Sequence, residues 1–380
     1  MSRLLPFLVF LAIALSLVGG MHYYLWVRLV RDPHLPQAWA RALTAALVVL
    51  AVSLPLALVA SRFATGPAAR GAAWVAFVWM GIGFLLVAFL GLADTGRLVA
   101  FMVARLRGME ADPERRLFLA RGLAGSVGAL VAGLSIFGTR SALGAVQVKR
   151  LDIKLKNLPQ ALSGLKLVQI SDVHVGPLLR HDWVGQLVDT IEGLKPDAVA
   201  ITGDLVDGRV SELAEHVAPL GRMKPPRGVW FVTGNHEYYS GPEEWLLHLP
   251  TLGVRPLRNE HHELAPGLDI AGIDDPTGAP DLTAALQGRD EKRPVILLAH
   301  QPRQFAEAAT KNVSLTLSGH THGGQIWPFT WLVALAQPYL AGLHSRGESQ
   351  LYVSRGTGFW GPPMRVFAPA EITLFTLTPA

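Results

Sequence analysis

The sequence contains no cysteine and little charge. Without cysteine, the chain of 380 residues has no disulfides, thiolate nucleophiles, zinc ribbons or iron–sulfur clusters. Asp, Glu, Lys and Arg make up 17% of the residues, against roughly 25% in soluble domains. This shortage of charge, with a positive mean hydropathy, argues against a wholly soluble or disordered chain. The length predicts two domains rather than one.

The charges that are present divide the chain into two parts. Residues 1–150 hold 15 Lys and Arg against 5 Asp and Glu, whereas residues 151–380 hold 19 against 24. The basic excess lies in short segments between apolar runs, which is typical of membrane proteins. A nucleic-acid binder would carry that excess on its folded domain, so nucleic acid is excluded as a partner.

Four apolar runs predict a transmembrane helix bundle within residues 1–145. The runs contain no Asp, Glu, Lys or Arg, and they comprise residues 4–27, 42–61, 72–93 and 122–139. About 20 apolar residues are enough for a helix to cross a bilayer. The fourth run is shorter and rich in Gly and Ala, so a buried soluble helix is its alternative interpretation. The first run has a signal peptide as its alternative, but no cleavage site follows it.

We interpret the four predicted helices as an anchor. Transporters place ionisable or broken-helix sites within the membrane, and the cores of the apolar runs offer only His22 and Pro55 for this purpose. The prediction is a multi-pass protein of the cell membrane, in contact with the lipid bilayer. Nine basic residues lie on one side of the four runs and eight on the other, so the positive-inside rule leaves both orientations open.

The second part, residues 146–380, has the pattern of an α/β domain. Short β-type runs alternate there with helical stretches at 183–194, 242–249 and 304–309. Five runs predict buried strands that are followed directly by polar motifs, at residues 166–171, 198–202, 229–233, 295–299 and 314–318. Further strands are predicted at 268–273, 351–354 and 372–377.

Each of the five predicted strands leads into a motif with residue types that can bind metals. In chain order the motifs are Asp172-Val173-His174, Gly203-Asp204-Leu205-Val206-Asp207, Gly234-Asn235-His236-Glu237, His300 and Gly319-His320-Thr321-His322. Ligand sites of open α/β sheets lie at the carboxyl ends of the strands, so we expect these side chains at one sheet edge. A single His or Asp after a strand is usually a turn or capping residue, whereas five such ends together indicate a metal site. The glycines before Asp204, Asn235 and His320 are expected in sharp turns.

The chemistry of the donors indicates two metal ions. Imidazole and carboxylate donors without sulfur suit Mn, Fe, Zn or Mg. Seven donors are too many for one ion, and they fit two divalent ions that share a bridging carboxylate.

Together these motifs resemble the calcineurin-like metallophosphoesterase superfamily. Asp-x-His, Gly-Asp-x-x-Asp, Gly-Asn-His-Glu, a lone His and Gly-His-x-His occur in that order, and the likeness covers roughly residues 150–378. Segments 171–176, 234–238 and 319–326 are most similar to the membrane-anchored branch, which includes the group called transmembrane protein with metallophosphoesterase domain. The resemblance implies an α/β/β/α sandwich that follows the membrane helices.

The resemblance also implies a role for each motif residue. The ligands of the first ion would be Asp172, His174, Asp204 and His322. The ligands of the second ion would be Asp204, Asn235, His300 and His320, so that Asp204 forms the bridge. The catalytic residue would be His236, which stands beside the phosphate and stabilises charge or protonates the leaving oxygen. Asp207 and Glu237 would orient the histidines from behind.

The predicted function is hydrolysis of a phosphate ester by a metal-bridged hydroxide, without a covalent intermediate. Members of the family include phosphodiesterases and hydrolases of lipid-linked pyrophosphates such as UDP-2,3-diacylglucosamine, and membrane anchoring makes a lipid-linked substrate reasonable here. Monoester, diester and pyrophosphate substrates stay open, as does the oligomeric state. The alternatives to an enzyme are a metal-binding but inactive scaffold and a sensor at the membrane.

The stretch 327–341 bears on the substrate. It follows the last metal motif, contains four aromatic residues and carries no Asp, Glu, Lys or Arg. Such a stretch is usually packed core. In a membrane-anchored enzyme, its alternative interpretation is an apolar lip beside the metals that admits a lipid tail.

Overall fold

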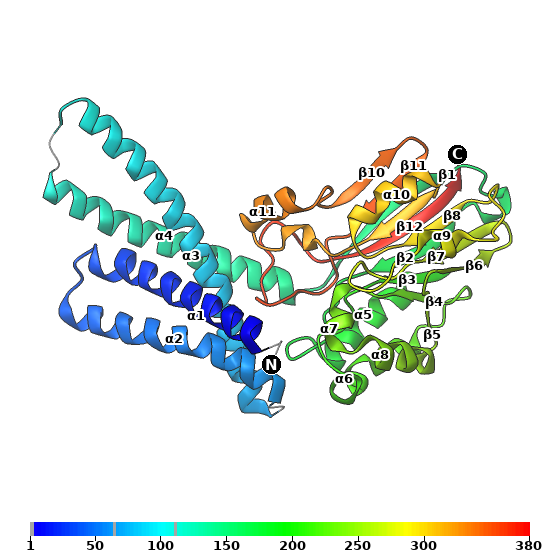
Figure 1. Ribbon diagram of the computed structural model, residues 1–380, viewed down its shortest axis with the longest axis horizontal. Helices are drawn as coiled ribbons and strands as arrows, with labels where there is room; N and C mark the ends of the chain where they lie inside the picture. Colours follow the sequence, from blue (N-terminus) through cyan, green and yellow to red (C-terminus); the bar gives the residue numbers. More distant parts are fainter. Residues whose placement is uncertain (1–3, 64–65, 110–111) are drawn as a thin grey trace. The chain divides into compact units, whose positions relative to one another are not determined.

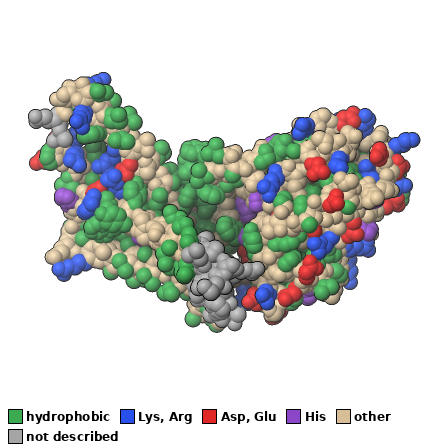
Figure 2. Space-filling view, viewed as in Figure 1, with side chains coloured by type: hydrophobic (Ala, Val, Ile, Leu, Met, Phe, Trp, Pro, Cys, Tyr) green, Lys and Arg blue, Asp and Glu red, His purple; other side chains and the backbone are tan. Residues whose placement is uncertain are grey.

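The computed structural model describes residues 4–63, 66–109 and 112–380, and these form two compact units (Figure 1). The first unit comprises Met1–Thr139 with Gly361–Pro363, and the second comprises Arg140–Trp360 with Met364–Ala380. The first unit is helical, whereas the second contains the strands. Figure 2 shows Asp, Glu, Lys and Arg side chains spread over the visible face of the second unit.

Long helices build the first unit. They are α1 (Leu4–Trp26), α2 (Gln37–Phe63), α3 (Pro67–Leu106) and most of α4 (Pro113–Leu143), with one π-helical turn, η1 (Val27–Arg31), after α1. Within the part of the chain that the structure describes, four helices are long and apolar enough to cross a membrane. Only a minority of the residues in these segments are buried inside the structure. Apolar side chains on the outside of such helices are stable when lipid covers them.

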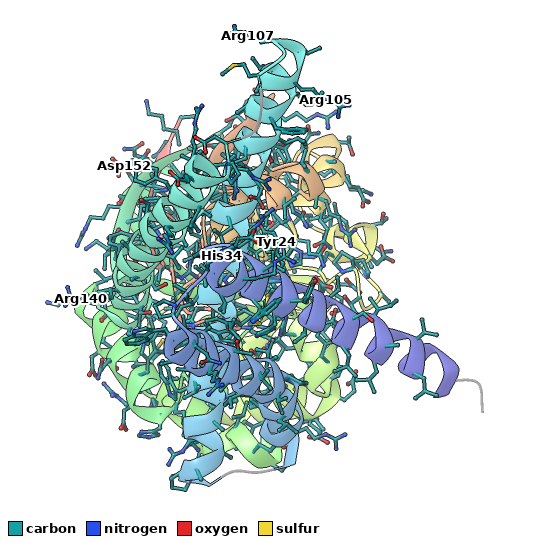
Figure 3. The ribbon with its side chains drawn as sticks, turned by 90° about the vertical axis from the view of Figure 1, so that its left-hand side faces the viewer. Tyr24, His34, Arg105, Arg107, Arg140 and Asp152 are labelled. Carbon is teal, nitrogen blue, oxygen red and sulfur yellow. The ribbon has the colours of Figure 1, made fainter. Side chains whose placement is uncertain are left out.

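Two of the helices extend well beyond the apolar runs that predicted them. The runs 72–93 and 122–139 lie inside α3 and α4. α3 has 40 residues and is therefore about 60 Å long, twice the thickness of a bilayer core. Arg105 and Arg107 lie near its C-terminal tip (Figure 3). The helix continues into this charged segment because Arg favours helix about as strongly as Leu does.

The ionisable residue inside the apolar runs is hydrogen-bonded within the helices. The ring Nδ1 of His22 lies 2.8 Å from the backbone carbonyl of Val18, and the indole N–H of Trp79 donates to Nε2 of His22 at 2.9 Å. Tyr24 and Arg28 both donate to the carboxylate of Asp94, at 2.7 and 2.8 Å. The bonds of Trp79 and Tyr24 join α1 to α3, and the bond of Arg28 joins η1 to α3.

The second unit is built on two six-stranded sheets. The first has the order β1-β12-β2-β3-β4-β5 and the second the order β10-β11-β9-β8-β7-β6. The strands of the first sheet are β1 (Gln147–Leu155), β12 (Glu371–Pro379), β2 (Leu165–Ile170), β3 (Ala198–Thr202), β4 (Val229–Val232) and β5 (Val254–Pro256). The strands of the second are β10 (Gly342–Arg346), β11 (Ser349–Val353), β9 (Leu315–Ser318), β8 (Val295–Leu298), β7 (Leu268–Gly272) and β6 (Glu260–Ala265).

Side chains alternate between the two faces of each strand and so build separate layers of core. In β2, Leu167 packs between the two sheets, whereas Val168 faces the helices outside the first sheet. Phe305 belongs to a third core, on the outer face of the second sheet. The helices are α5 (His181–Gly193), α6 (Val210–Val217), α7 (Asn235–Ser240), α8 (Pro242–His248), α9 (Leu282–Leu286), α10 (Phe305–Thr310) and α11 (Phe329–Ala336). The layers are those of an α/β/β/α sandwich, which confirms the predicted fold class.

The five motif strands form within one residue of their expected bounds, but they lie in two sheets. β2, β3 and β4 are parallel neighbours in the first sheet, and β8 and β9 are parallel neighbours in the second. The expectation of one sheet edge was therefore wrong. Strand patterns predict which segments extend, but they carry little information about which strands pair.

The apolar stretch after the last metal motif is not core. α11 occupies most of it and buries none of its residues. The packed-core interpretation is wrong for this helix, and its exposed face is considered further below.

Candidate metal centre

Loops at the carboxyl ends of five strands carry the predicted ligands. Asp172 and His174 follow β2, Asp204 follows β3, Asn235 starts α7 after β4, His300 follows β8, and His320 and His322 follow β9. Because parallel strands of one sheet end on the same side, each sheet presents its ligands together.

Glycine is required where these loops approach the ligands. A Cβ on Gly234 would lie 2.1 Å from Oδ1 of Asp204, and one on Gly319 would lie 2.2 Å from Oδ2 of Asp172. Of the three glycines expected in sharp turns, Gly203 has a φ of 83°, but Gly234 has a φ of −101° that any residue adopts. At Gly234, the closeness of the ligand carboxylate excludes a side chain, rather than the bend of the backbone.

The first group of converging side chains is Asp172, His174 and His322. The Nε2 atoms of His174 and His322 lie 3.0 Å apart, and Nε2 of His322 is 3.4 Å from Oδ1 of Asp172. Ligand atoms that stand about 2.0–2.2 Å from one ion, roughly at right angles, are about 3 Å apart. The spacing in this group fits a shared ion.

The second group is Asp204, His300 and His320. Nε2 of His300 lies 3.1 Å from Oδ2 of Asp204. Asn235 joins the group, because its Oδ1 is 3.0 Å from Nδ1 of His320. All seven predicted ligands are thus brought together in these two groups.

Asp204 lies between the two groups. Its Oδ2 is 3.1 Å from Nε2 of His300 in the second group and 3.9 Å from Nε2 of His174 in the first. Its Oδ1 accepts the backbone N–H of His236 at 2.9 Å. A buried oxygen that is close to a ligand nitrogen from each group has the position of a bridging carboxylate.

The surroundings of one buried nitrogen show whether the ligand residues fit a cation. Nδ1 of His300 lies 2.8 Å from the backbone carbonyl of Thr202, to which it donates. Nε2 of the neutral ring therefore carries a lone pair, and it is buried without a hydrogen-bond partner. This lone pair faces the carboxylate of Asp204 at 3.1 Å, and two acceptors at that distance repel unless a proton or a metal ion lies between them. The residues fit a divalent cation.

Five of the seven ligands have a left-handed backbone. Their φ angles are 53° at Asp172, 53° at His174, 51° at Asp204, 71° at His320 and 51° at His322. A positive φ at a residue other than glycine is uncommon, and each costs on the order of 1–3 kcal/mol. Such strain concentrates at functional sites, where the surrounding structure enforces it.

The two supporting carboxylates have different partners. Oδ1 of Asp207 lies 3.0 Å from Nδ1 of His174 and 2.6 Å from Nδ1 of His236, so Asp207 orients two histidines. Among the described residues, the hydrogen-bond partners of Glu237 are backbone N–H groups and include no histidine. Its carboxylate accepts the backbone N–H groups of Gly234 and Asp204 at 2.6 and 3.0 Å, and those of the two following residues at 2.8 and 3.3 Å. Glu237 therefore positions the loop that carries Asp204, rather than a ring.

Carboxylates raise the proton affinity of one histidine in each group. Burial lowers the pKa of His174, but the charge of Asp207 opposes it and raises the pKa to about 9. Burial likewise lowers the pKa of His300, and the charge of Asp204 raises it to about 10. Each group thus attracts a positive charge, which a metal ion would supply in place of the proton.

The other histidine of each group has the opposite tendency. Burial lowers the pKa of His320 to about 3, and the charge of His300 acts in the same direction. Burial and the charge of His174 hold the pKa of His322 well below its usual value. Both rings are neutral at physiological pH and can therefore donate a lone pair to a metal.

Three residues near the centre were not singled out from the sequence. The rings of Trp360 and Tyr239 lie 5.6 and 5.4 Å from the ring of His236, and both residues are exposed. Arg365 is fully buried and donates to the backbone carbonyls of Gly358, Arg355 and Ala368, and its Nη2 is 3.4 Å from Nδ1 of His322. A lone Trp, Tyr or Arg carries no spacing signal, so only the tertiary structure identifies them.

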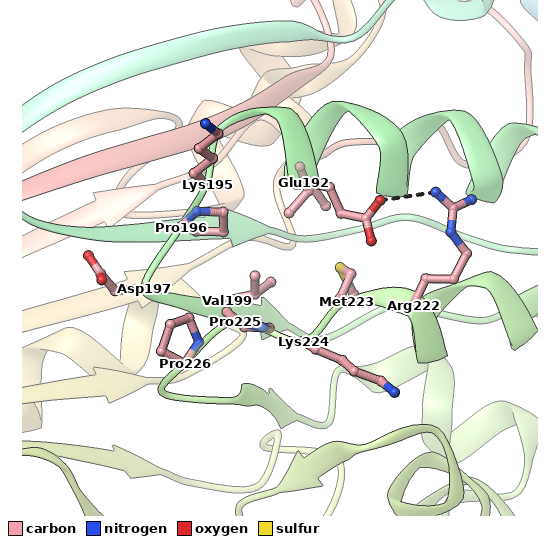
Figure 4. A pocket seen from close by; sticks show the side chains of 11 residues that line it. Glu192, Lys195, Pro196, Asp197, Val199, Arg222, Met223, Lys224, Pro225 and Pro226 are labelled. Carbon is pink, nitrogen blue, oxygen red and sulfur yellow. Dashed lines mark hydrogen bonds and ion pairs between the residues drawn. The ribbon is translucent and has the colours of Figure 1, made fainter.

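A surface hollow of about 470 Å³ lies away from these ligands (Figure 4). Pro196 and Pro226 line it, just before β3 and β4 begin. Glu192 and Arg222 form an ion pair of 3.0 Å at its wall. The hollow is at the opposite ends of the strands from Asp204, so it is not part of the metal centre.

Paired groups of His, Asp and Asn at the ends of a sandwich's strands define a metal-dependent hydrolase, and sequence comparison identifies the family. The profile of the calcineurin-like phosphoesterase family matches residues 165–324. A "transmembrane protein with metallophosphoesterase domain" from Danio rerio is 33% identical over 97% of this chain and 88% of its own length. A protein of the same name from Bos taurus is 37% identical over 80% of this chain and 74% of its own length. The chain belongs to the calcineurin-like metallophosphoesterase family.

The predicted resemblance is therefore confirmed, and the chain is a metal-dependent phosphoesterase. Members of this family normally hold two divalent metal ions. Among solved structures, a dimetal phosphatase from Danio rerio is similar with a TM-score of 0.34 and 13% identity, over 51% of this chain and 88% of that one.

Proposed function

We propose that the chain is a membrane-anchored phosphoesterase with two divalent ions, held by the two groups of ligands that share Asp204. The first ion has Asp172, His174, Asp204 and His322 as ligands, and the second has Asp204, Asn235, His300 and His320. The observation that carries the proposal is the position of Oδ2 of Asp204. This atom is 3.1 Å from Nε2 of His300 and 3.9 Å from Nε2 of His174.

The ligands would hold a pair of Mn, Fe, Zn or Mg ions, which would supply a hydroxide near neutral pH and stabilise charge on the phosphoryl oxygens. His236 is the catalytic residue of the proposal. Its Nδ1 is held by Asp207 at 2.6 Å, so its Nε2 is the atom that gives a proton to the leaving oxygen. Asp207 also holds His174, and one carboxylate thus fixes both a metal ligand and the proton donor.

The substrate of the proposal is a phosphodiester or a pyrophosphate that is linked to a lipid, with UDP-2,3-diacylglucosamine as one candidate. The four apolar helices support this choice, because helices of this length and composition can hold a chain in a membrane. We further propose that the chain is a multi-pass protein of the cell membrane. Trp360 and Tyr239, which are exposed beside His236, are positioned to contact the group attached to the phosphate.

The test uses the full-length protein in detergent, stripped of metal and then supplied with Mn, Fe, Zn or Mg. A chromogenic diester, a chromogenic monoester and UDP-2,3-diacylglucosamine are compared at equal concentration. We expect metal-dependent release of product from the diester or the pyrophosphate. Tight binding of two ions without turnover of any of the three would contradict the enzyme proposal and favour an inactive scaffold.

A further inference from the structure

α11 presents an apolar face to the outside of the second unit. Trp331, Leu332 and Leu335 are 60%, 57% and 86% exposed. Residues three and four apart in a helix share a face, so Leu335 lies beside both of the others. Exposed apolar residues of a soluble domain are usually scattered singly, and a contiguous group marks an interaction surface.

α11 closely follows the last ligand loop of the metal centre and packs against it. It starts seven residues after the ligand His322, and its first turn packs against Gly324. A Cβ on Gly324 would lie 2.4 Å from Cα of Thr330, so only glycine permits this approach. The rings of Trp327 and Trp331 lie 5.4 Å apart, which holds the tryptophan of the exposed face against the preceding segment.

A second exposed aromatic residue lies beside the same segment. Phe367 is 65% exposed and has a φ of 60°, a conformation that a bulky residue rarely adopts. Its ring is 6.1 Å from that of Trp327, and its backbone pairs with Ile326. The strained backbone at Phe367 indicates that the surrounding fold holds this segment in one conformation.

The chemistry of the face fits a lipid surface better than a protein partner. Residues 327–341 contain no Asp, Glu, Lys or Arg that would give a protein partner specificity. Trp, Phe and Leu are the residues that interfacial helices bury at the headgroup boundary, and α11 exposes Trp331, Leu332 and Leu335, although it has no basic face. With eight residues, α11 is about 12 Å long and cannot span a bilayer.

The connection between the last apolar helix and the second unit is short. Three residues separate the end of α4 at Leu143 from the start of β1 at Gln147. Such a connection spans at most about 14 Å when fully extended. The chain therefore enters the second unit directly after its last apolar helix.

We propose that α11 inserts its exposed face of Trp331, Leu332 and Leu335 into the interface of the bilayer that anchors the chain. This inference rests on the proposed membrane anchoring, but insertion is a property of the surface and does not depend on turnover.

The absence of cysteine allows a direct test on the full chain. Leu335→Cys and, separately, Trp331→Cys are spin-labelled, and the protein is reconstituted into phosphatidylcholine and phosphatidylglycerol nanodiscs. The matched control is Leu247→Cys on α8, because this leucine is 77% exposed in the same unit. Accessibility to oxygen and to a water-soluble nickel complex reports the depth of each label by electron paramagnetic resonance.

We expect the labels at 331 and 335 to lie about 5–10 Å below the lipid phosphates, and the control label to lie in water. Labels at 331 and 335 as accessible to nickel as the control would overturn the proposal. Dipolar broadening between labels on two chains, without contact to lipid, would overturn it in favour of self-association. Since depth is measured without substrate, an inactive protein gives the same readout, and failure of the proposed function is separately visible.

Discussion

A methyl group added at Gly234 would disturb the bridging carboxylate without altering any ligand. The Cβ of Gly234→Ala would stand 2.1 Å from Oδ1 of Asp204 and 2.4 Å from its backbone nitrogen, whereas ordinary contact begins at 3.4 Å. Asp204 must therefore move by more than about 1 Å, and a displacement of that size at a reacting centre costs about 10²-fold in rate. The φ of −101° at Gly234 suits alanine, so the effect arises from the contact alone.

The control is Gly185→Ala, in the middle of α5. A Cβ there meets nothing within 4 Å, and alanine favours helix over glycine by about 1 kcal/mol. Both variants are assayed as full-length protein for metal-dependent hydrolysis of a chromogenic diester, with metal content and thermal melting measured on the same samples. We expect full activity and a slightly higher melting temperature for Gly185→Ala. For Gly234→Ala we expect loss of about 10²-fold in turnover, with a stability cost of about 1–3 kcal/mol from overpacking. Wild-type turnover with both ions retained in Gly234→Ala would refute the role of Asp204.

Four further outcomes follow from the geometry. His236→Ala should lower turnover by about 10²–10⁴-fold with both ions retained, and an equal loss of bound metal would show that the residue is structural instead. Arg365→Met should lower the melting temperature and the metal content, because each buried carbonyl left without a donor costs about 1–3 kcal/mol, whereas Arg346→Met at an exposed position should change neither. The pKa of His174 is raised to about 9 and that of His300 to about 10, so protons compete with metal below those values, and affinity should rise about tenfold per pH unit for each proton released. The same raised values stabilise the metal-free protein below about pH 6.5, and this stability should fall as the pH rises through about 9, as thermal melting would show. Calorimetry in two buffers of different ionisation enthalpy counts the protons, and a metal affinity independent of pH would contradict the account.

The sequence predicted the elements that carry the ligands because their signals are local. β3 has the predicted bounds 198–202, since an apolar run there ends at a Gly-Asp pair. The same logic applies to β8 and His300. By contrast, β1 and β6 were not predicted. β1 mixes charged residues into the strand and buries only Ile153 and Leu155, and β6 begins with Glu-His-His-Glu, so neither has an apolar run.

Features that depend on distant parts of the chain could not be predicted in this way. The division of the motif strands between two sheets rests on pairing between segments far apart in sequence. Glu237 was expected behind a histidine, but the fold turns its carboxylate toward backbone N–H groups. Arg365 acts through carbonyls that come near it only in the folded chain.

The most direct test of the central claim counts the metal ions bound by the wild type and by Asp204→Asn, on the samples used for diester hydrolysis. The two groups of ligands share Asp204, so we predict two ions per chain in the wild type, and loss of at least one ion together with turnover in the variant. A wild type that binds no ion, or a variant that keeps both ions and its activity, would contradict the binuclear centre.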